Sequence, residues 1–566
     1  MKADEWYRAH ADLLDRADAA CSSRAAHSPF TESPSGRLHP PDARARGGQW
    51  FEQVRGSQFP DTGPPDADRF VGAESSPYTL EPLGISYVRP TADQAAGAAE
   101  AAWPCLLGTT ADQRIGICLE ALHRLSGALF ENAFATMHTA GQAFMMAFAG
   151  SGANSLDRGL EAVVFAHRAM AQVPETAVFE RDFGHRRVRL EKSYRIRGRG
   201  LAIVITCGSY PLWNAYPAIF ANLATGNPVI VKPHPTTILP VALAVQIIRG
   251  TLTDAGLDPD LVVLAPDTPG SPITDALVDH PATRIVDFTG SPGYGARLEA
   301  RTDRLVYTET AGCNAVVLEG ADDLDAALDA VARGLMTFSG QMCTAPQNIF
   351  IPPTVDTPAG PVGYGQVRDR LVARVDELSA DPKLAPALCG ALHSPNTAED
   401  MARLAGGARC DGSQRLLREG TPYTDATFPH ARTRTPTLIE EPVDGSGHKG
   451  ERFGPVAFVI PCPDRDAALA AATSEADEHG AIASYAYTRD PGFADRIESA
   501  FWSAGASVGI NLIGQQPINY TAGYSDYHVT GLNPAGNASL TDIAFVADRF
   551  RIVQSKREVR TDAGPT

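Results

Sequence analysis

Length, composition and charge exclude several classes of protein before any motif is considered. The chain has 566 residues, a formal net charge of −17, 44% hydrophobic residues and 20% charged residues. These proportions are ordinary for a globular protein, and at about 150 residues per domain the length predicts two to four domains. The acidic balance argues against nucleic-acid binding driven by bulk charge, because phosphate contacts need a basic surface.

The cysteines and the N-terminal segment predict a cytoplasmic protein. Nine cysteines are scattered without a C-x-x-C pair, which indicates a reducing compartment and no structural zinc or other metal site. Residues 1–24 follow an amphipathic helical pattern and lack the apolar core of a signal peptide. No uncharged apolar stretch reaches the roughly 18 residues that a membrane span needs, so no membrane association is expected.

The first part of the chain changes character near residue 91. Residues 26–92 are rich in Pro, Gly, Ser and Asp and predict an extended arm wrapped on the body, with a flexible tail as the alternative. Residues 91–173 contain Ala-rich segments with helical periodicity. Several packed helices are therefore expected before the first strand of a sheet.

An alternation of strands and helices follows. Residues 186–199 alternate charged and apolar side chains, which predicts an exposed strand or hairpin. From residue 201, short β-branched runs such as LAIVITC, PVIVKP, LVVLAP and RIVDFTG are separated by helical stretches. This pattern is typical of a parallel, doubly wound sheet, which binds ligands at the carboxyl ends of its strands. Residues 314–512 repeat it, so the predicted fold class is α/β with a second α/β domain.

Three residues are candidates for catalysis. Cys343 lies in the polar turn FSGQMCTAPQN, where a thiolate nucleophile is favoured, although a lone cysteine is more often inert. Glu309 ends the short strand RLVYTE and can act as a general base on water, or can be a solvated turn residue. Asn214 opens a helix in CGSYPLWNAYPAIF and can donate its amide to an oxyanion, or can serve as an ordinary N-cap.

Further residues indicate a nucleotide site. Lys232 directly follows a buried strand, a position that an ammonium group occupies usefully only beside an anion or hydroxyl groups. Gly290 and Gly295 lie at a strand-to-helix turn that lets phosphate approach backbone N–H groups, although the turn lacks the G-x-G-x-x-G fingerprint. Glu451 and Phe453 stand just before another strand.

The order and spacing of these motifs closely resemble the aldehyde dehydrogenase superfamily over roughly residues 90–560. The resemblance implies a Rossmann-type nucleotide-binding domain, an α/β catalytic domain and a small β oligomerisation element. Cys343 in G-Q-M-C then matches the nucleophile, Glu309 in T-E-T-A-G the general base, and Asn214 in P-L-W-N-A-Y-P the oxyanion-hole asparagine.

The same resemblance implies a set of cofactor-binding residues along the chain. They are Trp213, Lys232, His234, Gly290, Ser291, Glu451 and Phe453. Within this set Lys232 matches the lysine that meets the adenosine ribose, Gly290 and Ser291 match the nucleotide turn, and Glu451 and Phe453 match the residues that hold the nicotinamide ribose and ring.

Departures from the family pattern bear on the cofactor. Pro235 stands where NAD-preferring relatives often carry a glutamate that binds both ribose hydroxyls. Without that carboxylate a 2′-phosphate is not repelled, and Lys232 with His234 can attract it, so NADP is favoured over NAD; a surface turn role for His234 is the alternative. Cys313 replaces a lysine and Ala311 a glycine of the family's Glu-x-Gly-Gly-Lys motif, and neither change removes a reacting group.

We predict four segments along the chain. Residues 1–90 form the N-terminal helix and arm, residues 91–310 the NAD(P)-binding domain with the oligomerisation strand near 186–199, residues 311–520 the catalytic domain with the nucleophilic cysteine, and residues 521–566 a C-terminal return and oligomerisation strand. A homo-oligomer is therefore expected, with a plain solvated hairpin as the alternative.

A narrower resemblance concerns the substrate. The segments PSGRLHPP, ESSPYTLEPLGISYVRP, LATGNPVIVKPHPTTILP and SDYHVTGLNPAGNASLTDIAFVADRFRIVQSKR look like those of the PaaN-type aldehyde dehydrogenases of aerobic phenylacetate degradation. This implies oxidation of an acyl-CoA semialdehyde to the acid. The chain ends soon after its final predicted strand, so we expect no fused hydratase domain and a separate protein for ring opening.

Two alternative functions remain open at this point. In a CoA-acylating dehydrogenase CoA would resolve the thioester in place of water, which the presence of Glu309 disfavours. A non-catalytic binding or assembly protein on the same fold is disfavoured because all three reacting residues are present.

Overall fold

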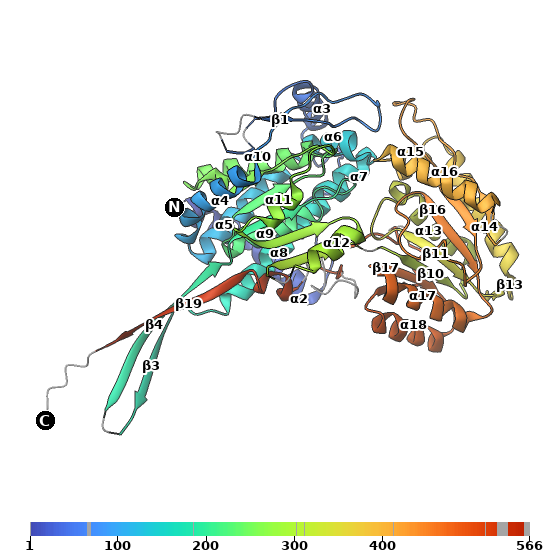
Figure 1. The fold of residues 1–566 in the computed structure, drawn as a ribbon. Helices are drawn as coiled ribbons and strands as arrows, with labels where there is room; N and C mark the ends of the chain where they lie inside the picture. The colour runs from blue at the N-terminus through green and yellow to red at the C-terminus, as the bar shows by residue number, and fades with distance from the viewer. Residues whose placement is uncertain are drawn as a thin grey trace.

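The structure is a computed structural model that describes residues 2–60, 62–64, 69–184, 186–301, 303–310, 312–410, 413–514, 517–528 and 542–559. Figure 1 shows two lobes, each built around its own sheet, and a long strand assembly that projects from the first lobe. None of the described helices is long and apolar enough to cross a membrane. Ala311, one of the departures noted above, lies outside the described residues.

The N-terminal segment packs on the first lobe through helices and a small strand pair. Its elements are α1 (Lys2–Ala9), α2 (Ala11–Ser23), α3 (Ala43–Val54), β1 (Phe70–Val71) and β2 (Tyr87–Val88). The prediction for residues 26–92 missed α3, because the two glycines in ARARGGQWFEQV lower its helix propensity. Tertiary contacts stabilise it instead: Phe51 stacks on His138 at 4.5 Å between ring centroids.

The predicted helical region is confirmed. It comprises α4 (Ala92–Leu107), α5 (Ala111–Ser126), α6 (Leu129–Ala140), α7 (Phe144–Phe148), the π-helical turn η1 (Ala149–Ala153) and α8 (Asn154–Ala171). Helices α4 and α5 each begin with a capping box, Thr91 with Gln94 and Thr110 with Gln113. These reciprocal bonds satisfy backbone donors that would otherwise lack a partner.

The first sheet has five parallel strands in the order β7-β6-β5-β8-β9. Its strands are β5 (Leu201–Ile205), β6 (Val229–Lys232), β7 (Val262–Leu264), β8 (Thr283–Thr289) and β9 (Leu305–Glu309). The connecting elements are α9 (Ala215–Thr225), α10 (Leu239–Asp254), η2 (Pro259–Leu261), α11 (Thr274–Asp279) and α12 (Pro292–Glu299). Alternate residues of β5 face opposite layers: Ile203 packs with Ala99 of α4, and Val204 packs with the cluster that contains α9 and α10.

The second sheet has seven strands in the order β14-β15-β16-β11-β10-β17-β18, and β14 with β15 is its antiparallel pair. The strands are β10 (Asn314–Leu318), β11 (Pro346–Ile351), β14 (Arg415–Arg418), β15 (Thr437–Glu440), β16 (Val456–Pro461), β17 (Ala483–Tyr487) and β18 (Ser507–Ile510). The surrounding elements are α13 (Leu324–Met336), η3 (Thr337–Gly340), β12 (Thr354–Val355), β13 (Val362–Gly363), α14 (Tyr364–Ala380), α15 (Leu384–Cys389), α16 (Pro395–Cys410), α17 (Arg465–His479) and α18 (Pro491–Ser503). Both predicted α/β sheets are therefore present.

The projecting assembly is a three-stranded antiparallel sheet in the order β19-β4-β3. It joins β3 (Thr176–Asp182) and β4 (Arg187–Gly198) to β19 (Phe550–Glu558), which follows α19 (Ile543–Ala547) near the end of the chain. The exposed hairpin predicted near residues 186–199 is confirmed. Large apolar side chains are exposed along this projecting sheet and its hairpin, at Val178, Phe179, Phe183, Ile552 and Val553.

A buried ion pair fixes the C-terminal segment to the first sheet. The Arg549 guanidinium donates to both carboxylate oxygens of Asp287 on β8, at 2.8 and 2.6 Å. The rings of Tyr307 and Phe545 lie 4.2 Å from the guanidinium carbon. Because Arg549 is fully buried, loss of either partner would leave an uncompensated charge inside the first lobe.

Candidate active site

One cavity of about 1030 Å³ gathers the predicted catalytic residues and the cofactor-binding residues that the family resemblance implies. The wall includes these ten residues: Trp213, Asn214, Lys232, His234, Gly290, Ser291, Glu309, Cys343, Glu451 and Phe453. Gly295 of the predicted nucleotide turn is buried within α12 and is not part of the wall. Lys232 and Glu309 end their strands, so the cavity lies at the carboxyl edge of the five-stranded sheet. Ligands bind at this edge in parallel sheets.

Cys343 is held by the loop between η3 and β11. The Asn314 side-chain amide donates to the carbonyl oxygens of Cys343 and Ala345, at 2.8 and 2.9 Å. Upstream, Phe338 and Ser339 adopt left-handed backbone angles, with φ of 49° and 52°. Non-glycine residues in this conformation cost energy and persist only where surrounding contacts enforce it.

Gly340 completes this strained turn. Its φ is +65°, and a Cβ there would lie 2.4 Å from the carbonyl oxygen of Gly454. Only glycine fits such a close approach of two backbone segments. The turn therefore brings the nucleophile loop against the loop that carries Glu451 and Phe453.

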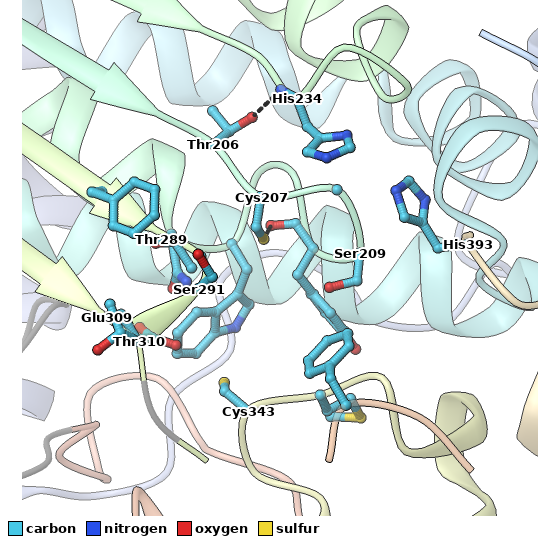
Figure 2. Close-up of a pocket in the computed structure, with 18 of the residues that line it drawn as sticks. Thr206, Cys207, Ser209, His234, Thr289, Ser291, Glu309, Thr310, Cys343 and His393 are labelled. Atoms are coloured by element: carbon cyan, nitrogen blue, oxygen red, sulfur yellow. Dashed lines mark hydrogen bonds between the residues drawn. The ribbon is translucent and has the colours of Figure 1, made fainter. Parts of the chain in front are cut away.

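Three reactive side chains from distant segments meet in the cavity. His528 Nε2 lies 3.1 Å from Glu309 Oε1 and 3.6 Å from Cys343 Sγ. The reactive atoms of all three lie within 4.8 Å of one another. Figure 2 shows Cys343 and Glu309 on the wall of this cavity, brought there by different segments of the chain.

Burial and negative charge govern ionisation here. Burial, followed by the nearby Glu309 carboxylate, raises the pKa of the Cys343 thiol well above its ordinary value. Burial and the same carboxylate raise the pKa of Glu451 to about 7. A thiolate at Cys343 therefore needs a positive charge or hydrogen-bond donors close to the sulfur.

Asn214 immediately precedes α9, at the N-cap position, but its side chain does not cap the helix. Its side chain makes no hydrogen bond to the helix backbone, so the alternative of an ordinary N-cap is not what the structure has. Within the described residues its buried amide oxygen has no hydrogen-bond partner. The adjacent Trp213 packs edge-on against His528, with 4.6 Å between ring centroids.

Lys232 meets an anion, as its position after a buried strand predicts. Its Nζ lies 2.6 Å from Asp267 Oδ1. Burial lowers the pKa of Lys232, and the Asp267 carboxylate opposes that shift. Burial and the Lys232 charge also lower the pKa of His234 to about 4. The His234 ring is therefore neutral at pH 7.

The turn between β8 and α12 suits a phosphate group. Ser291 precedes α12 and makes no side-chain cap. A Cβ on Gly290 would lie 2.6 Å from the Phe288 ring, so the turn is as tight as the sequence predicts. Backbone N–H groups at a helix start attract anions, and together with Lys232 and Glu451 this turn fits a dinucleotide.

Cys313 borders a buried charged network. His448 Nδ1 lies 2.7 Å from Glu441 Oε2, and its Nε2 lies 2.8 Å from Glu475 Oε1. The Cys313 thiol lies 3.9 Å from Glu475 Oε2. Burial opposes the charged imidazole, but hydrogen bonds to Glu441 and Glu475 raise the pKa of His448 to about 9. A histidine cation thus stands near the position where relatives have lysine.

Comparison with known proteins identifies the family of this chain. A sequence model described as the aldehyde dehydrogenase family matches residues 85–526. The chain belongs to the aldehyde dehydrogenase family. It is similar to the crystal structure of an NAD-dependent aldehyde dehydrogenase from Burkholderia multivorans, with 39% identity, a TM-score of 0.94, and coverage of 98% of this chain and 99% of that one.

Curated relatives match over a shorter region. A protein named 1-pyrroline-5-carboxylate dehydrogenase 2, from Halalkalibacterium halodurans, is 30% identical over 288 residues, which is 46% of this chain and 50% of that protein. The chain thus spans about half the length of this relative. A 1-pyrroline-5-carboxylate dehydrogenase from Thermus, crystallised with bound NAD, shares the fold with a TM-score of 0.72 at 19% identity, and the match covers 94% of this chain and 98% of that one.

Three residues of this aldehyde dehydrogenase site were not identified from the sequence. They are His528 beside the nucleophile, Asp267 beside Lys232, and Glu32, which reaches the cavity wall from the N-terminal arm. Each lies in a polar loop whose composition is ordinary. Glu32 also lies outside the region that the family model matches.

The His448 network predicts a specific dependence of stability on pH. Because its folded-state pKa of about 9 exceeds the ordinary 6.5, the network stabilises the fold fully below pH 6.5 and loses this contribution as pH rises through 9. His448→Gln should lower the thermal midpoint at pH 6.5 by several degrees and flatten its decline between pH 7 and 9. Thermal unfolding across this range measures both effects.

The matched control is His479→Gln, a half-buried histidine on the same helix as Glu475. It should keep the midpoint and the slope of the parent enzyme. An unchanged slope in His448→Gln would contradict a charged histidine between the two glutamates.

Proposed function

We propose that the chain oxidises an aldehyde to a carboxylic acid with NAD(P), through a covalent intermediate on Cys343. One observation carries this proposal: Cys343, Glu309 and Asn214 line the same cavity as the predicted cofactor residues. A shared cavity supports a concerted role for groups that lie far apart along the chain.

The residues divide the chemistry among them. The Cys343 thiolate adds to the aldehyde carbon, and the Asn214 amide with the Cys343 backbone N–H stabilises the oxyanion. The bound nicotinamide supplies the hydride acceptor, for which Lys232, the turn at Gly290 and Glu451 would hold the dinucleotide. Glu309 then takes a proton from the water that hydrolyses the Cys343 thioester.

Two substitutions separate these steps. Cys343→Ala should abolish aldehyde oxidation, because no thioester can form. Glu309→Gln should release a stoichiometric burst of reduced cofactor followed by turnover about 100-fold slower, since the loss of a general base costs about that much. Rapid-mixing absorbance of the reduced nicotinamide measures both. A Glu309→Gln enzyme with unchanged steady-state turnover would refute the assignment of the base.

We propose NAD as the better cofactor, in place of the NADP expected from Pro235. The Lys232 charge is matched by buried Asp267, and His234 is neutral, so neither supplies a net positive charge to a 2′-phosphate. Asp275 and Arg297 also line the cavity and balance each other in charge. The NAD-dependent activity in the name of the similar Burkholderia protein supports the same choice.

Asp267→Asn tests this choice of cofactor. Removal of the carboxylate leaves Lys232 with a net positive charge, which should raise the ratio of kcat/KM for NADP to that for NAD about tenfold. Steady-state kinetics with both cofactors measure the ratio, and Asp279→Asn, an exposed aspartate paired with Arg301, serves as control. Parent enzyme that prefers NADP, or an unchanged ratio in Asp267→Asn, would count against this proposal.

We propose that the substrate is an aldehyde that carries no negatively charged group within this cavity. Glu32 Oε1 accepts hydrogen bonds from Asn154 Nδ2 at 2.9 Å and from the Tyr520 hydroxyl at 3.0 Å. This carboxylate would repel a carboxylate-bearing aldehyde such as the substrate class that the curated relatives' names indicate. An acyl-CoA semialdehyde of the phenylacetate type stays compatible, because its pantetheine arm is uncharged and its amides can donate to Glu32.

A panel of aldehydes of one length tests the role of Glu32. The kcat/KM for butanal should exceed that for succinate semialdehyde, and Glu32→Gln should narrow this ratio about tenfold because it removes like-charge repulsion. Glu52→Gln, an exposed glutamate of the same arm, should leave the ratio unchanged. A parent enzyme that prefers succinate semialdehyde would overturn the substrate class.

The same kinetics with a CoA-linked semialdehyde, and product analysis with and without free CoA, separate hydrolysis from CoA acylation. Glu309 close to the sulfur favours water, not CoA, as the acceptor of the acyl group.

We also propose that the exposed apolar side chains of the β19-β4-β3 sheet bind another copy of the chain, since edge strands of this kind are commonly paired. A separate hydratase and a cytoplasmic location stay predictions.

A further inference from the structure

His528 occupies a position between the nucleophile and the general base. Its Nε2 faces both groups, at 3.6 Å from Cys343 Sγ and 3.1 Å from Glu309 Oε1. The imidazole is almost completely buried, as is the Glu309 carboxylate. The same ring nitrogen makes both contacts, and among the described residues Nδ1 has no hydrogen-bond partner. In the tautomer with the proton on Nδ1, Nε2 can accept the thiol proton, and the N–H bond so formed can then donate to Glu309.

We propose that His528 is a catalytic residue that accepts the proton of the Cys343 thiol and returns it to the departing sulfur. This proposal rests on the proposed aldehyde oxidation, whose nucleophile it activates. Glu309 stabilises the imidazolium through its carboxylate and also serves the later hydrolysis.

The position of His528 is fixed by contacts that do not involve the substrate. Its ring packs against the Trp213 indole. The Arg158 guanidinium carbon lies 5.0 Å from the centroid of the same indole. Arg158 is fully buried and donates to backbone carbonyls of the same segment, Thr521, Ala522 and Asp526, at 3.1–3.4 Å. The loop that carries His528 is thus tied to α8.

Several ionisable groups face the pair of His528 and Cys343. Glu309 approaches from the end of β9, and Glu451 from the loop before β16 contributes a further negative potential at the thiol. Cys207 after β5 and Tyr210 also interact with the Cys343 sulfur, and both are neutral at pH 7. The Arg158 guanidinium lies over the Trp213 indole, which also packs against the imidazole.

Proton transfer within this group conserves charge. The S–H bond of Cys343 breaks and an N–H bond forms at Nε2, which turns a neutral thiol and a neutral imidazole into a thiolate and an imidazolium. Burial then opposes the step much less than it opposes loss of the proton to solvent, because the two new charges form in contact. When the thioester is hydrolysed, the Nε2 proton can pass back to the sulfur, so the cycle consumes no extra proton.

Thiolate formation can be measured without aldehyde or cofactor. Ultraviolet absorbance near 240 nm, as the difference between the parent enzyme and Cys343→Ser, follows the Cys343 thiolate across pH 5–10. The rate of iodoacetamide alkylation of the Cys343 peptide, read by mass spectrometry, reports the same group. The parent should form the thiolate at a lower pH than a variant without the imidazole, because the imidazolium offsets part of the effect of burial and of the Glu309 carboxylate.

His528→Gln keeps hydrogen-bonding capacity but cannot accept the proton. It should slow alkylation at pH 7 about 100-fold and move the inflection about two pH units above that of the parent, with the burst of reduced cofactor slowed in parallel. His528→Gly with added imidazole should recover part of the alkylation rate. His430→Gln, an exposed histidine in the second lobe, is the control and should match the parent.

The outcomes are distinguishable from failure of the proposed function. Equal inflections of the Cys343 absorbance in the parent enzyme and in His528→Gln overturn the role of His528, even if the enzyme oxidises aldehydes. An unchanged alkylation profile in His528→Gln does the same. The expected thiolate in an enzyme inactive toward all aldehydes would uphold the Cys343–His528 pair and refute only the proposed oxidation.

Discussion

The contact of a buried carboxylate with a thiol is the constraint on which the rest of this site depends. Glu309 is only 2% exposed and its carboxylate lies within 4.8 Å of the Cys343 sulfur. A negative charge in that place disfavours the thiolate that the chemistry needs. Several features of the fold fix the geometry around this contact. The Asn314 amide and the strained turn at Phe338 and Ser339 hold the nucleophile loop in place, and the His528 ring lies between the sulfur and the carboxylate.

The C-terminal segment completes the first lobe and also supplies β19 to the projecting three-stranded sheet. Arg549 pairs with Asp287 inside the five-stranded sheet, and Arg158 of α8 binds the carbonyls of the loop before His528. The chain leaves the first lobe after β9, builds the second sheet, and returns to contribute a group to the cavity. The active site is therefore made of both lobes, and the contacts that secure the returning segment also set the geometry around Cys343.

Charge balance in this molecule is kept by residues at unexpected positions. Pro235 removes the expected carboxylate near the ribose lysine, and Asp267 supplies one from the loop after β7. Cys313 replaces a lysine of the family motif, while His448 carries a positive charge between Glu441 and Glu475 beside it. Since an unpaired buried charge is costly, each of these buried charged groups has a partner of opposite charge.

The sequence by itself determined the alternation of strands and helices, the exposed hairpin and ten of the residues on the cavity wall, because these depend on local periodicity and on short motifs. It missed α3, whose glycine-containing helix is stabilised by the contact of Phe51 with His138. It also missed Asp267 and Glu32, which lie in loops without a motif, and it gave no role to His528, although the SDYHVTG segment that contains this residue resembles the PaaN-type enzymes. Only the tertiary structure decided their proximity to Cys343, Lys232 and Asn154, because contacts between residues 35 to 185 positions apart depend on how sheets and returning segments pack, and no local pattern encodes that distance.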